Sequence, residues 1–373
     1  MSVMIDRRRL LAGAGAMGVL MSDAKAAGGE RFSALALQTV CDAVNQDKTA
    51  EAARARMLAA VGRVKGQVAA SKGFLKSFNG YDLNLVVLPE YWMTGFPLRE
   101  TREEWQDKAV IDVDGEIEGQ IAAIAKTFGV YLCSNHYEND ANFPDLYFQA
   151  NVVYAPSGEA VLRYRRMISL YSPTPYDVWD QYLKIYGEDG VFPVVDTEIG
   201  RIGTVASEEI LYPEVARMLG LKGAELILHP TSEVGAPGLT PKDVAKRARA
   251  LENIAYVISA NSAGIEGTPV PTASTDLMSK IVDWKGAVVA EAGPGETMNA
   301  NAVIDLDGLR SARRRTGMSN FMSRLPLDAF RAGYGETRAK ANRTADGKMI
   351  ERADAIAHQQ AVIDDLAKRG LVK

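Results

Sequence analysis

Short apolar runs alternate with amphipathic stretches along the chain from Phe32 onward. Apolar runs bounded by turn residues are typical of buried β-strands. This pattern predicts strands over residues 32–39, 83–88, 130–134, 149–154, 161–163, 192–196, 202–206, 226–229, 256–261, 280–282 and 302–304.

Helical spacing of apolar residues is clearest between the first two predicted strands. Residues 49–78 place Ala, Met, Leu and Val on one face and Arg and Lys on the other, which predicts a long amphipathic helix. The same pattern predicts helices over residues 117–127, 212–219 and 241–253. The last of these has Thr240 as its N-cap and Pro241 at its first helical position.

Turn residues at 155–158, 198–200 and 284–286 join neighbouring strands into predicted hairpins, so the sheets are expected to be mixed rather than purely parallel. No internal repeat or low-complexity linker divides the chain. The simplest interpretation is one α/β domain.

The first 26 residues have the pattern of an export signal, unlike the rest of the chain. A triplet, Arg7-Arg8-Arg9, precedes an apolar run over residues 10–21, and Ala24-Lys25-Ala26 has the small residues of a cleavage site. The run has about a dozen residues, fewer than the ~20 that a bilayer-spanning helix needs. The arginines followed by two leucines resemble a twin-arginine signal. Residues 1–26 are therefore expected to direct export to the periplasm or the medium and to be removed, leaving no membrane anchor.

Composition and charge narrow the classes of function. Lys and Arg number 43 against 47 Asp and Glu, a net charge of −4, so no whole-chain positive field exists to bind nucleic acid. With only Cys41, Cys133 and three histidines, the chain is too poor in ligands for a disulfide framework or a Cys/His metal site. No Gly-rich phosphate cradle is present either, so no metal and no cofactor are expected.

The first candidate for chemistry is Glu90. It comes directly after the predicted strand 83–88 and has Tyr91 and Trp92 as neighbours. A residue at the carboxyl end of a strand in an α/β sheet faces the usual ligand crevice and is placed for general acid or base work. A hydrogen-bonded structural acid is the alternative.

Two other strand ends carry polar groups. The strand 161–163 runs into Arg163, Arg165 and Arg166, which on its own is typical of a solvated edge. The strand 202–206 leads through a sharp turn at Ser207 into a helix, where backbone N–H groups can stabilise an oxyanion. Taken alone, Ser207 would be interpreted as a helix cap.

The order and spacing of these three strand ends resemble the carbon–nitrogen hydrolase (nitrilase) superfamily, whose members use a Glu, a Lys and a Cys there. The resemblance extends from about Phe32 to Gly317. It rests on Leu88-Pro89-Glu90, Arg163-Tyr164-Arg165-Arg166, Ala206-Ser207-Glu208-Glu209, Tyr212-Pro213-Glu214 and, downstream, on residues 249–257, Asn261, Gly264, residues 279–283 and Gly286.

This resemblance implies a four-layer α-β-β-α sandwich over residues 31–317, which commonly pairs across helices into homodimers or larger oligomers. Residues 318–373 form a more polar C-terminal extension. A helix over residues 354–368 would pack on a partner subunit or lie in solvent.

The chain departs from the family at two of the three positions. Glu90 is retained, but Ser207 stands at the cysteine position and Arg166 at the lysine position. A serine hydroxyl needs a base during attack, whereas a thiol is partly ionised at neutral pH. Arginine keeps a positive charge but cannot donate a proton. Neither Cys41 nor Cys133 lies at the expected turn, so a thiol route there is excluded.

Two hypotheses follow. In the first, the protein is an exported hydrolase of an amide or related C–N bond in a small molecule, with an ester as the alternative substrate. Glu90 is the base, Ser207 is the nucleophile, and Arg166 with the Glu208 N–H stabilises the oxyanion. In a variant, Glu90 activates water and Ser207 only positions the substrate. In the second, the protein is catalytically silent and binds a small acidic ligand or a protein partner.

Further residues are candidates for substrate contact because they lie at strand ends or in the loop after Arg166. They are Tyr91, Trp92, Glu138, Asp177, Glu208 and His229. For Glu138 a structural hydrogen bond is an equal alternative, and a lone strand-end His229 is more often structural. The loop 171–180 is rich in Pro and aromatic residues and is expected to be rigid.

Overall fold

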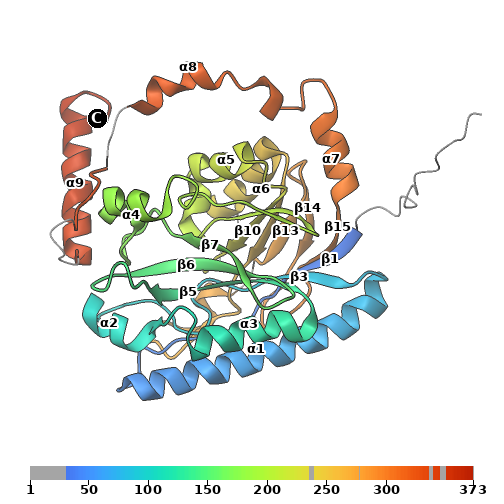
Figure 1. The fold of residues 1–373 in the computed structure, drawn as a ribbon, viewed down its shortest axis with the longest axis horizontal. Helices are drawn as coiled ribbons and strands as arrows, with labels where there is room; N and C mark the ends of the chain where they lie inside the picture. The colour runs from blue at the N-terminus through green and yellow to red at the C-terminus, as the bar shows by residue number, and fades with distance from the viewer. Residues whose placement is uncertain (1–30, 235–238, 277, 336–338, 345–349, 373) are drawn as a thin grey trace, which may run out of the picture.

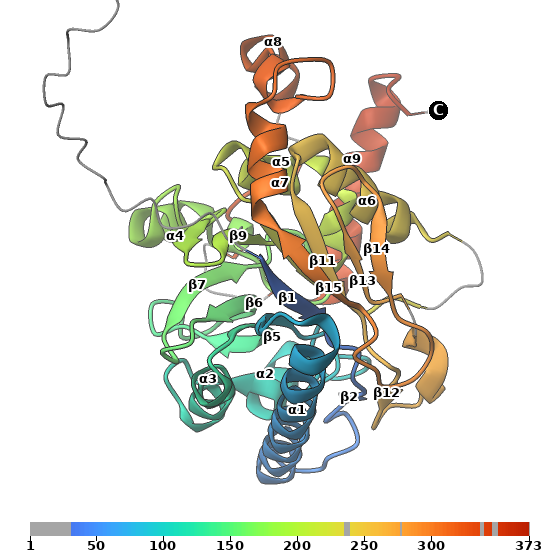
Figure 2. The same cartoon turned by 90° about the vertical axis from the view of Figure 1, so that its right-hand side faces the viewer.

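The computed structural model describes residues 31–234, 239–276, 278–335, 339–344 and 350–372. The predicted leader, residues 1–26, lies outside the described residues. Two β-sheets stack face to face, with helices on their outer faces (Figures 1 and 2). The predicted α-β-β-α sandwich is confirmed.

The first sheet has the strand order β15-β1-β3-β5-β6-β7, with β4 beside β5. Strands β1, β3 and β5 are parallel, whereas β6, β7 and β15 run antiparallel to their neighbours. The strands span Arg31–Ala36 (β1), Leu83–Val87 (β3), Val110–Ile111 (β4), Tyr131–Asn139 (β5), Tyr147–Tyr154 (β6), Ala160–Arg165 (β7) and Asn301–Asp305 (β15).

The second sheet has the order β14-β13-β11-β10-β9-β8, with β9, β10 and β11 parallel. Its strands span Val195–Thr197 (β8), Gly200–Thr204 (β9), Leu226–Pro230 (β10), Tyr256–Ala260 (β11), Lys280–Val282 (β13) and Val288–Glu291 (β14). A small separate pair joins β2 (Cys41–Asp42) to β12 (Ile265–Glu266).

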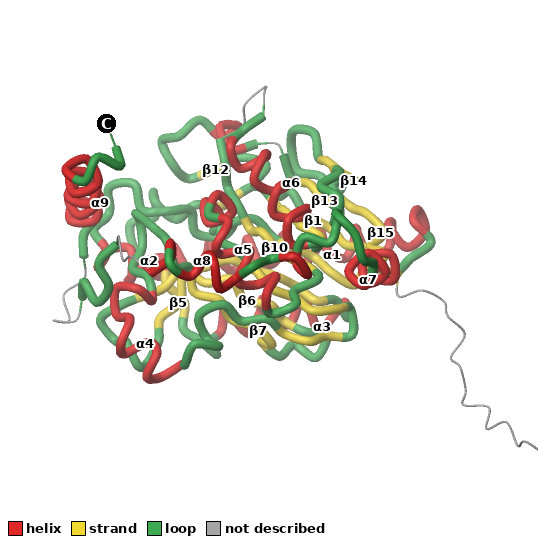
Figure 3. The backbone as a smooth tube through the Cα atoms, turned by 90° about the horizontal axis from the view of Figure 1, so that it is seen from above, coloured by secondary structure: helices red, strands yellow, loops and turns green. Residues whose placement is uncertain are grey.

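Helices cover both outer faces. On the first sheet lie α1 (Ala50–Asn79), α2 (Arg102–Ala109) and α3 (Glu116–Phe128), and on the second lie α5 (Pro213–Leu221) and α6 (Pro241–Asn253). The remaining helices are α4 (Trp179–Tyr186), α7 (Leu306–Arg314), α8 (Leu327–Arg331) and α9 (Arg352–Lys368). Helices α7 and α9 stand toward opposite ends of the long axis (Figures 1 and 3).

The helix α1 shows how sequence produces these layers. Thr49 caps its first turn by accepting a hydrogen bond from Ala52 N at 3.2 Å. Gly80 ends it in the left-handed conformation, at φ 73°. The buried residues along α1 recur every three or four positions and pack on the first sheet. Between the two sheets, the inward-facing residues of both form a second, continuous apolar core.

Most predicted elements are present within a few residues of their expected bounds. All three predicted hairpins are confirmed, as β6–β7, β8–β9 and β13–β14. The strand predicted over 192–196 begins only at Val195. The prediction of a loop over residues 171–180 is wrong in part, because Pro175–Val178 forms a 3₁₀ helix that leads directly into α4.

Within the part of the chain that the structure describes, no helix combines the length and the apolar character needed to cross a membrane.

Candidate active site

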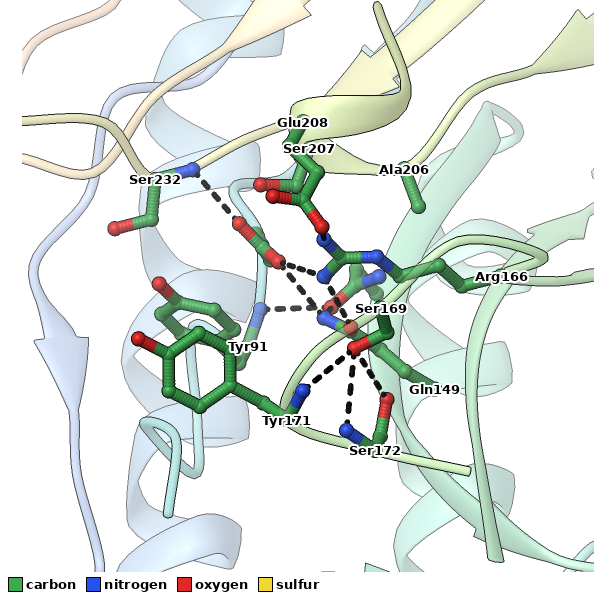
Figure 4. Close-up of polar contacts among 12 residues, drawn as sticks. Tyr91, Gln149, Arg166, Ser169, Tyr171, Ser172, Ala206, Ser207, Glu208 and Ser232 are labelled. Atoms are coloured by element: carbon green, nitrogen blue, oxygen red, sulfur yellow. Dashed lines mark hydrogen bonds and ion pairs between the residues drawn. The ribbon is translucent and has the colours of Figure 1, made fainter. Parts of the chain in front are cut away.

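Strand ends from both sheets meet at one place, and they carry Glu90, Arg166 and Ser207. Glu90 follows β3 and Arg166 follows β7 in the first sheet, whereas Ser207 follows β9 in the second. A 3.2 Å hydrogen bond from Glu90 N to Thr231 O joins the ends of β3 and β10 across the sandwich. Figure 4 shows Arg166 reaching toward Glu208, the residue after Ser207. The structure therefore brings together the three residues that the sequence singled out.

Glu90 is held by three donors. Only 2% of the residue is exposed. Its Oε1 accepts hydrogen bonds from Gln149 Nε2 and Arg166 Nη1, both at 3.0 Å. Its Oε2 accepts one from the backbone N–H of Ser232 at 3.1 Å. A buried carboxylate is costly without such partners, so Glu90 is both charge-paired and fixed in orientation.

Arg166 is the centre of the polar cluster. Besides its bond to Glu90, it donates from Nε to Ile168 O at 2.7 Å, from Nη1 to Gln149 Oε1 at 2.8 Å and from Nη2 to Glu208 Oε1 at 2.7 Å. Burial lowers the pKa of Arg166, but attraction to Glu90 and Glu208 outweighs it, so the pKa lies above the ordinary arginine value. Arg166 therefore supplies a permanent, fixed positive charge.

Ser207 sits on a strained turn. It opens the 3₁₀ helix η2 (Ser207–Leu211) and has φ 48°, in the left-handed region that serine seldom adopts. Such a turn aims a side chain away from the strand and sets the following N–H groups beside it. The geometry is that of a nucleophile elbow.

The imidazole of His229 supports this turn. Its Nε2 lies 2.8 Å from Ser207 O, and its Nδ1 lies 2.9 Å from Ser259 Oγ. A carbonyl oxygen only accepts, so Nε2 carries the proton. Burial lowers the pKa of His229 well below its ordinary value, which keeps the ring neutral. The structure thus places His229, expected to contact substrate, in a bond with the main chain of the elbow.

A residue that the sequence analysis missed contacts the Ser207 hydroxyl. Lys242, at the start of α6, donates from Nζ to Ser207 Oγ at 3.1 Å and to Thr231 Oγ1 at 3.2 Å. The sequence places Lys242 in the first turn of the helix that Thr240 is predicted to cap. No spacing signal tied it to a serine 35 residues earlier.

Glu209 holds the loop after β7 against the elbow. Its Oε1 accepts from Met167 N at 2.7 Å, Ile168 N at 3.0 Å and Tyr164 Oη at 2.9 Å. Its Oε2 accepts from Ala206 N at 3.2 Å. Burial raises the pKa of Glu209 to about 7 despite these donors. Glu209 is a positioning residue that couples the segment carrying Arg166 to the one carrying Ser207.

Behind the cluster, a buried polar chain crosses from one sheet to the other. Gln149 Nε2 donates to Asn135 Oδ1 at 3.1 Å, and Asn135 Nδ2 donates to Asn151 Oδ1 at 2.7 Å. Asn151 Nδ2 donates to Thr204 Oγ1 at 2.6 Å, and that hydroxyl donates to Leu228 O at 2.9 Å. Satisfied networks of this kind fix one geometry in a core.

Three residues that were expected to contact the substrate, Trp92, Glu138 and Asp177, make buried contacts within the protein instead. Trp92 is fully buried and donates from Nε1 to Ser134 Oγ at 3.1 Å. Glu138 is also fully buried and forms ion pairs with Arg163 and Arg165, so its structural alternative describes it. Asp177 has only 3% of its surface exposed and pairs with Arg343 of the C-terminal extension.

Asp177 anchors the C-terminal extension. Its Oδ2 accepts from Thr174 N and Oγ1, both at 2.9 Å, and its Oδ1 pairs with Arg343 Nη2 at 2.6 Å. Thr344 N donates to Asp177 O at 3.0 Å. A buried acid with these partners has a structural role.

Tyr91 and Glu208 remain beside the cluster. The Tyr91 backbone has φ 36° and donates from N to Asn135 Oδ1 at 2.8 Å. Its ring lies 5.3 Å from that of Phe96. The Glu208 side chain is 35% exposed and reaches Arg166 from the solvent side.

Both cysteines are buried and free. Burial raises the pKa of the Cys133 thiol to about 12 and that of Cys41 further still. Neither residue can supply a thiolate near neutral pH.

A cavity of about 640 Å³ opens beside Glu208. It is bordered by Met167 and Ile168 after β7, by Tyr212 before α5, and by Val362 of the extension. It is large enough for a small organic molecule. Among the described residues, no three His, Cys, Asp or Glu side chains gather closely enough to hold a metal ion.

A two-sheet sandwich that brings a Glu, a cation and the residue of a sharp strand-to-helix turn together at its strand ends is an architecture of the nitrilase type. The chain belongs to the carbon-nitrogen hydrolase family, whose model matches residues 35–314.

Individual relatives agree with this assignment. The chain is 32% identical to a nitrilase of Pyrococcus abyssi over 194 residues, 52% of this chain and 67% of the relative. It is 28% identical to the omega-amidase NIT2-A of Xenopus laevis over 62% of this chain and 80% of the relative. The carbon-nitrogen hydrolase structure from Helicobacter pylori G27 superposes with a TM-score of 0.63 and 22% identity, covering 83% of this chain and 99% of that one.

Proposed function

We propose that this protein hydrolyses an amide or related C–N bond of a small molecule, with Ser207 as the nucleophile. The observation that carries the proposal is the Ser207 hydroxyl on a left-handed elbow, hydrogen-bonded to Lys242, in the same site as the Glu90–Arg166 ion pair. Family membership and the amidase and nitrilase relatives support the same class of bond.

In this mechanism the substrate presents its carbonyl carbon to Ser207 Oγ, and the rest of the molecule extends past Glu208 toward the cavity that Glu208 borders. The fixed charge of Arg166 and the amide N–H groups at the start of η2 stabilise the oxyanion that forms. Departure of the amine leaves an acyl-enzyme on Ser207. Glu90 then takes a proton from the water that hydrolyses the acyl group.

The test is a panel of small amides, nitriles, ureides and esters, followed by release of ammonia or amine. We expect Ser207→Ala to lower turnover on the order of 10³-fold or more. We expect Glu90→Gln to slow the second step, so that an acyl adduct on Ser207 accumulates and is seen by mass spectrometry. Glu188→Gln, at an exposed acid, is the matched control. Turnover unchanged by Ser207→Ala would overturn the assignment.

A silent ligand-binding protein is the second candidate, and one observation favours it. Among the described residues, acceptors already take four of the five N–H groups of Arg166, as in a structural clamp. Joint replacement of Ser207 by Cys and Arg166 by Lys separates the two candidates. A competent scaffold gains amidase or nitrilase activity, whereas continued inertness of both proteins on the panel supports the silent binder.

We also propose that the protein is exported by its leader and acts as a homodimer or larger homo-oligomer. The basic and apolar pattern of residues 1–26 supports export. Joint replacement of Arg7, Arg8 and Arg9 by Lys should leave the precursor inside the cell. Terminal sequencing of the exported form should find the cut after Ala26, and export unaffected by the triple change would refute a twin-arginine route.

A further inference from the structure

The Ser207 hydroxyl has a lysine, not a carboxylate, as its partner. Lys242 Nζ lies 3.1 Å from Ser207 Oγ, within the range for direct proton transfer. Both oxygens of Glu90 are occupied by Gln149, Arg166 and Ser232. Among the described residues, Lys242 is the one titratable group hydrogen-bonded to that hydroxyl.

Lys242 is held in place by a well-anchored helix. Thr240 caps α6 by accepting from Asp243 N at 3.1 Å, and Thr240 Oγ1 donates to Glu233 Oε2 at 3.2 Å. Lys246, one turn further along α6, forms a buried ion pair with Glu233. Lys242 itself is partly buried and bonded to Thr231 as well as Ser207. It is therefore placed like a site residue rather than a solvated surface lysine.

The surroundings favour a lysine that can lose its proton. Burial is the largest influence and lowers the pKa of Lys242 below the ordinary lysine value. The charges that face it act both ways: Glu90, Glu233 and Glu208 raise the pKa, and Arg166 lowers it. A serine adjacent to such an amine is a known arrangement for activating a hydroxyl.

We propose that Lys242 is the proton-transfer residue for Ser207 and forms a Ser–Lys pair with it. The inference rests on the proposed function and adds to it the group that activates the nucleophile. Arg166, at the family's lysine position, cannot exchange a proton, so the lysine of this site reaches the serine from α6 instead.

The proton balance is complete within the site. Neutral Lys242 Nζ takes the Oγ proton as the bond from Oγ to the carbonyl carbon forms and the C=O electron pair moves onto oxygen. When the oxyanion collapses, the C–N bond breaks and Lys242 returns that proton to the leaving nitrogen. Water then attacks the acyl-enzyme and gives a proton to Glu90. The proton passes to Lys242, and Lys242 Nζ, which is hydrogen-bonded to Ser207 Oγ, gives it to Oγ as the acid departs.

The test uses a small fluorophosphonate, which needs no knowledge of the substrate. Ser207 Oγ forms the bond to phosphorus, fluoride leaves, and the Oγ proton passes to Lys242. We expect the labelling rate, followed by mass spectrometry of the Ser207 peptide, to rise with pH around a midpoint below the ordinary lysine range. Lys242→Met and Lys242→Arg should each slow labelling by at least ~100-fold and remove that rise.

Two controls separate catalysis from folding. Lys222→Met removes an exposed lysine paired with Asp189 and should label at the wild-type rate. Lys242→Ala should recover labelling when small alkylamines are added, which loss of a structural contact would not allow. Thermal unfolding of each variant confirms that it is folded.

The outcomes distinguish the two proposals. Labelling of Ser207 that is equally fast in the Lys242 variants overturns the inference and leaves the proposed function standing. Absence of any Ser207 labelling in the wild-type protein refutes Ser207 as a nucleophile and, with it, both proposals.

Discussion

At the scale of single residues, Ser207 has an unfavourable left-handed backbone conformation that hydrogen bonds from neighbouring residues hold in place. A non-glycine residue in the left-handed region costs roughly 1–3 kcal/mol and persists only where the surroundings impose it. The hydrogen bond from His229 Nε2 to Ser207 O is one such constraint. The carboxylate of Glu209, bound to the preceding Ala206 N, is another.

We predict that His229→Leu destabilises the protein and weakens Ser207 as a nucleophile. The substitution leaves the Ser207 carbonyl without its donor, at a cost of about 1–3 kcal/mol in the free energy of unfolding. Urea denaturation measures the stability and fluorophosphonate labelling measures the reactivity. Ser259→Ala, which removes only the partner of Nδ1, is the matched control and should have the smaller effect on labelling. Equal effects would contradict the role given to His229.

Buried ionisable groups predict a particular pH dependence of stability. Burial lowers the pKa of His229 well below its usual range and that of His136 to about 4. The unfolded chain therefore binds more protons at these sites below about pH 6.5, and their contribution to stability is lost on acidification from there toward pH 4. Glu209, with its pKa raised to about 7, acts in the opposite direction, because the folded state holds that proton more tightly.

We accordingly expect Glu209→Gln to make the loss of stability on acidification steeper between pH 6.5 and 4.5. The slope of the unfolding free energy against pH, from denaturant titrations, is the quantity to compare, since the substitution also alters absolute stability. An unchanged slope would show that Glu209 has the same protonation in the folded and unfolded protein.

At the scale of elements, the first turn of α6 is a functional part of the site. Thr240 caps the helix and Pro241 occupies its first position. The cap therefore fixes the backbone position from which the Lys242 side chain extends to Ser207. Stability and reactivity should therefore be linked at this helix end.

We predict that Thr240→Ala costs about 1 kcal/mol of stability and also slows labelling of Ser207. Thr49→Ala removes the equivalent cap of α1, on the far side of the sandwich, and provides a control of similar energetic cost. Only the α6 variant should change labelling. A loss of reactivity in both would mean that the effect is one of general stability.

The elements that the sequence predicted well are those with a repeated signal. The long helix α1 has a cap, a left-handed end and regular apolar spacing, and the central strands are continuous apolar runs. The helices α2, α4 and α7, each eight or nine residues long, were missed, whereas α5, also nine residues long, was predicted. So short an element depends on tertiary packing more than on its own pattern.

The residues of the candidate site also fall into two groups, those whose convergence the sequence predicts and those whose contacts it does not. Glu90, Arg166 and Ser207 each follow a recognisable strand, so their convergence could be predicted from topology. Lys242 contacts Ser207 only because α6 packs beside η2, which no local pattern encodes. The ion pair of Asp177 was not predicted for a similar reason, since its partner Arg343 lies far along the chain in the C-terminal extension.

At the scale of the whole molecule, α5 and α6 leave apolar side chains exposed on the outside of the sandwich. Met218 and Leu221 of α5 are 37% and 39% exposed, and Val244 and Leu251 of α6 are 54% and 40% exposed. Apolar residues grouped on two adjacent helices are typical of a protein–protein contact.

We predict that a second copy of the chain covers these helices. Met218→Asp combined with Leu251→Asp should shift the protein toward monomer in analytical ultracentrifugation. Phe78→Asp on α1, at a residue 73% exposed on the opposite outer face, is the control and should leave the assembly unchanged. A wild-type protein that sediments as a monomer would refute the homo-oligomer.

The burial of Cys41 and Cys133 has a consequence for the conditions under which this site can operate. Oxidants and alkylating agents attack accessible thiolates, and the chain offers none near neutral pH. A reaction that depends on the Ser207 hydroxyl needs no reductant to stay active and should withstand peroxide and iodoacetamide at concentrations that silence thiol enzymes. This independence from a reductant is consistent with the export that we propose for the protein.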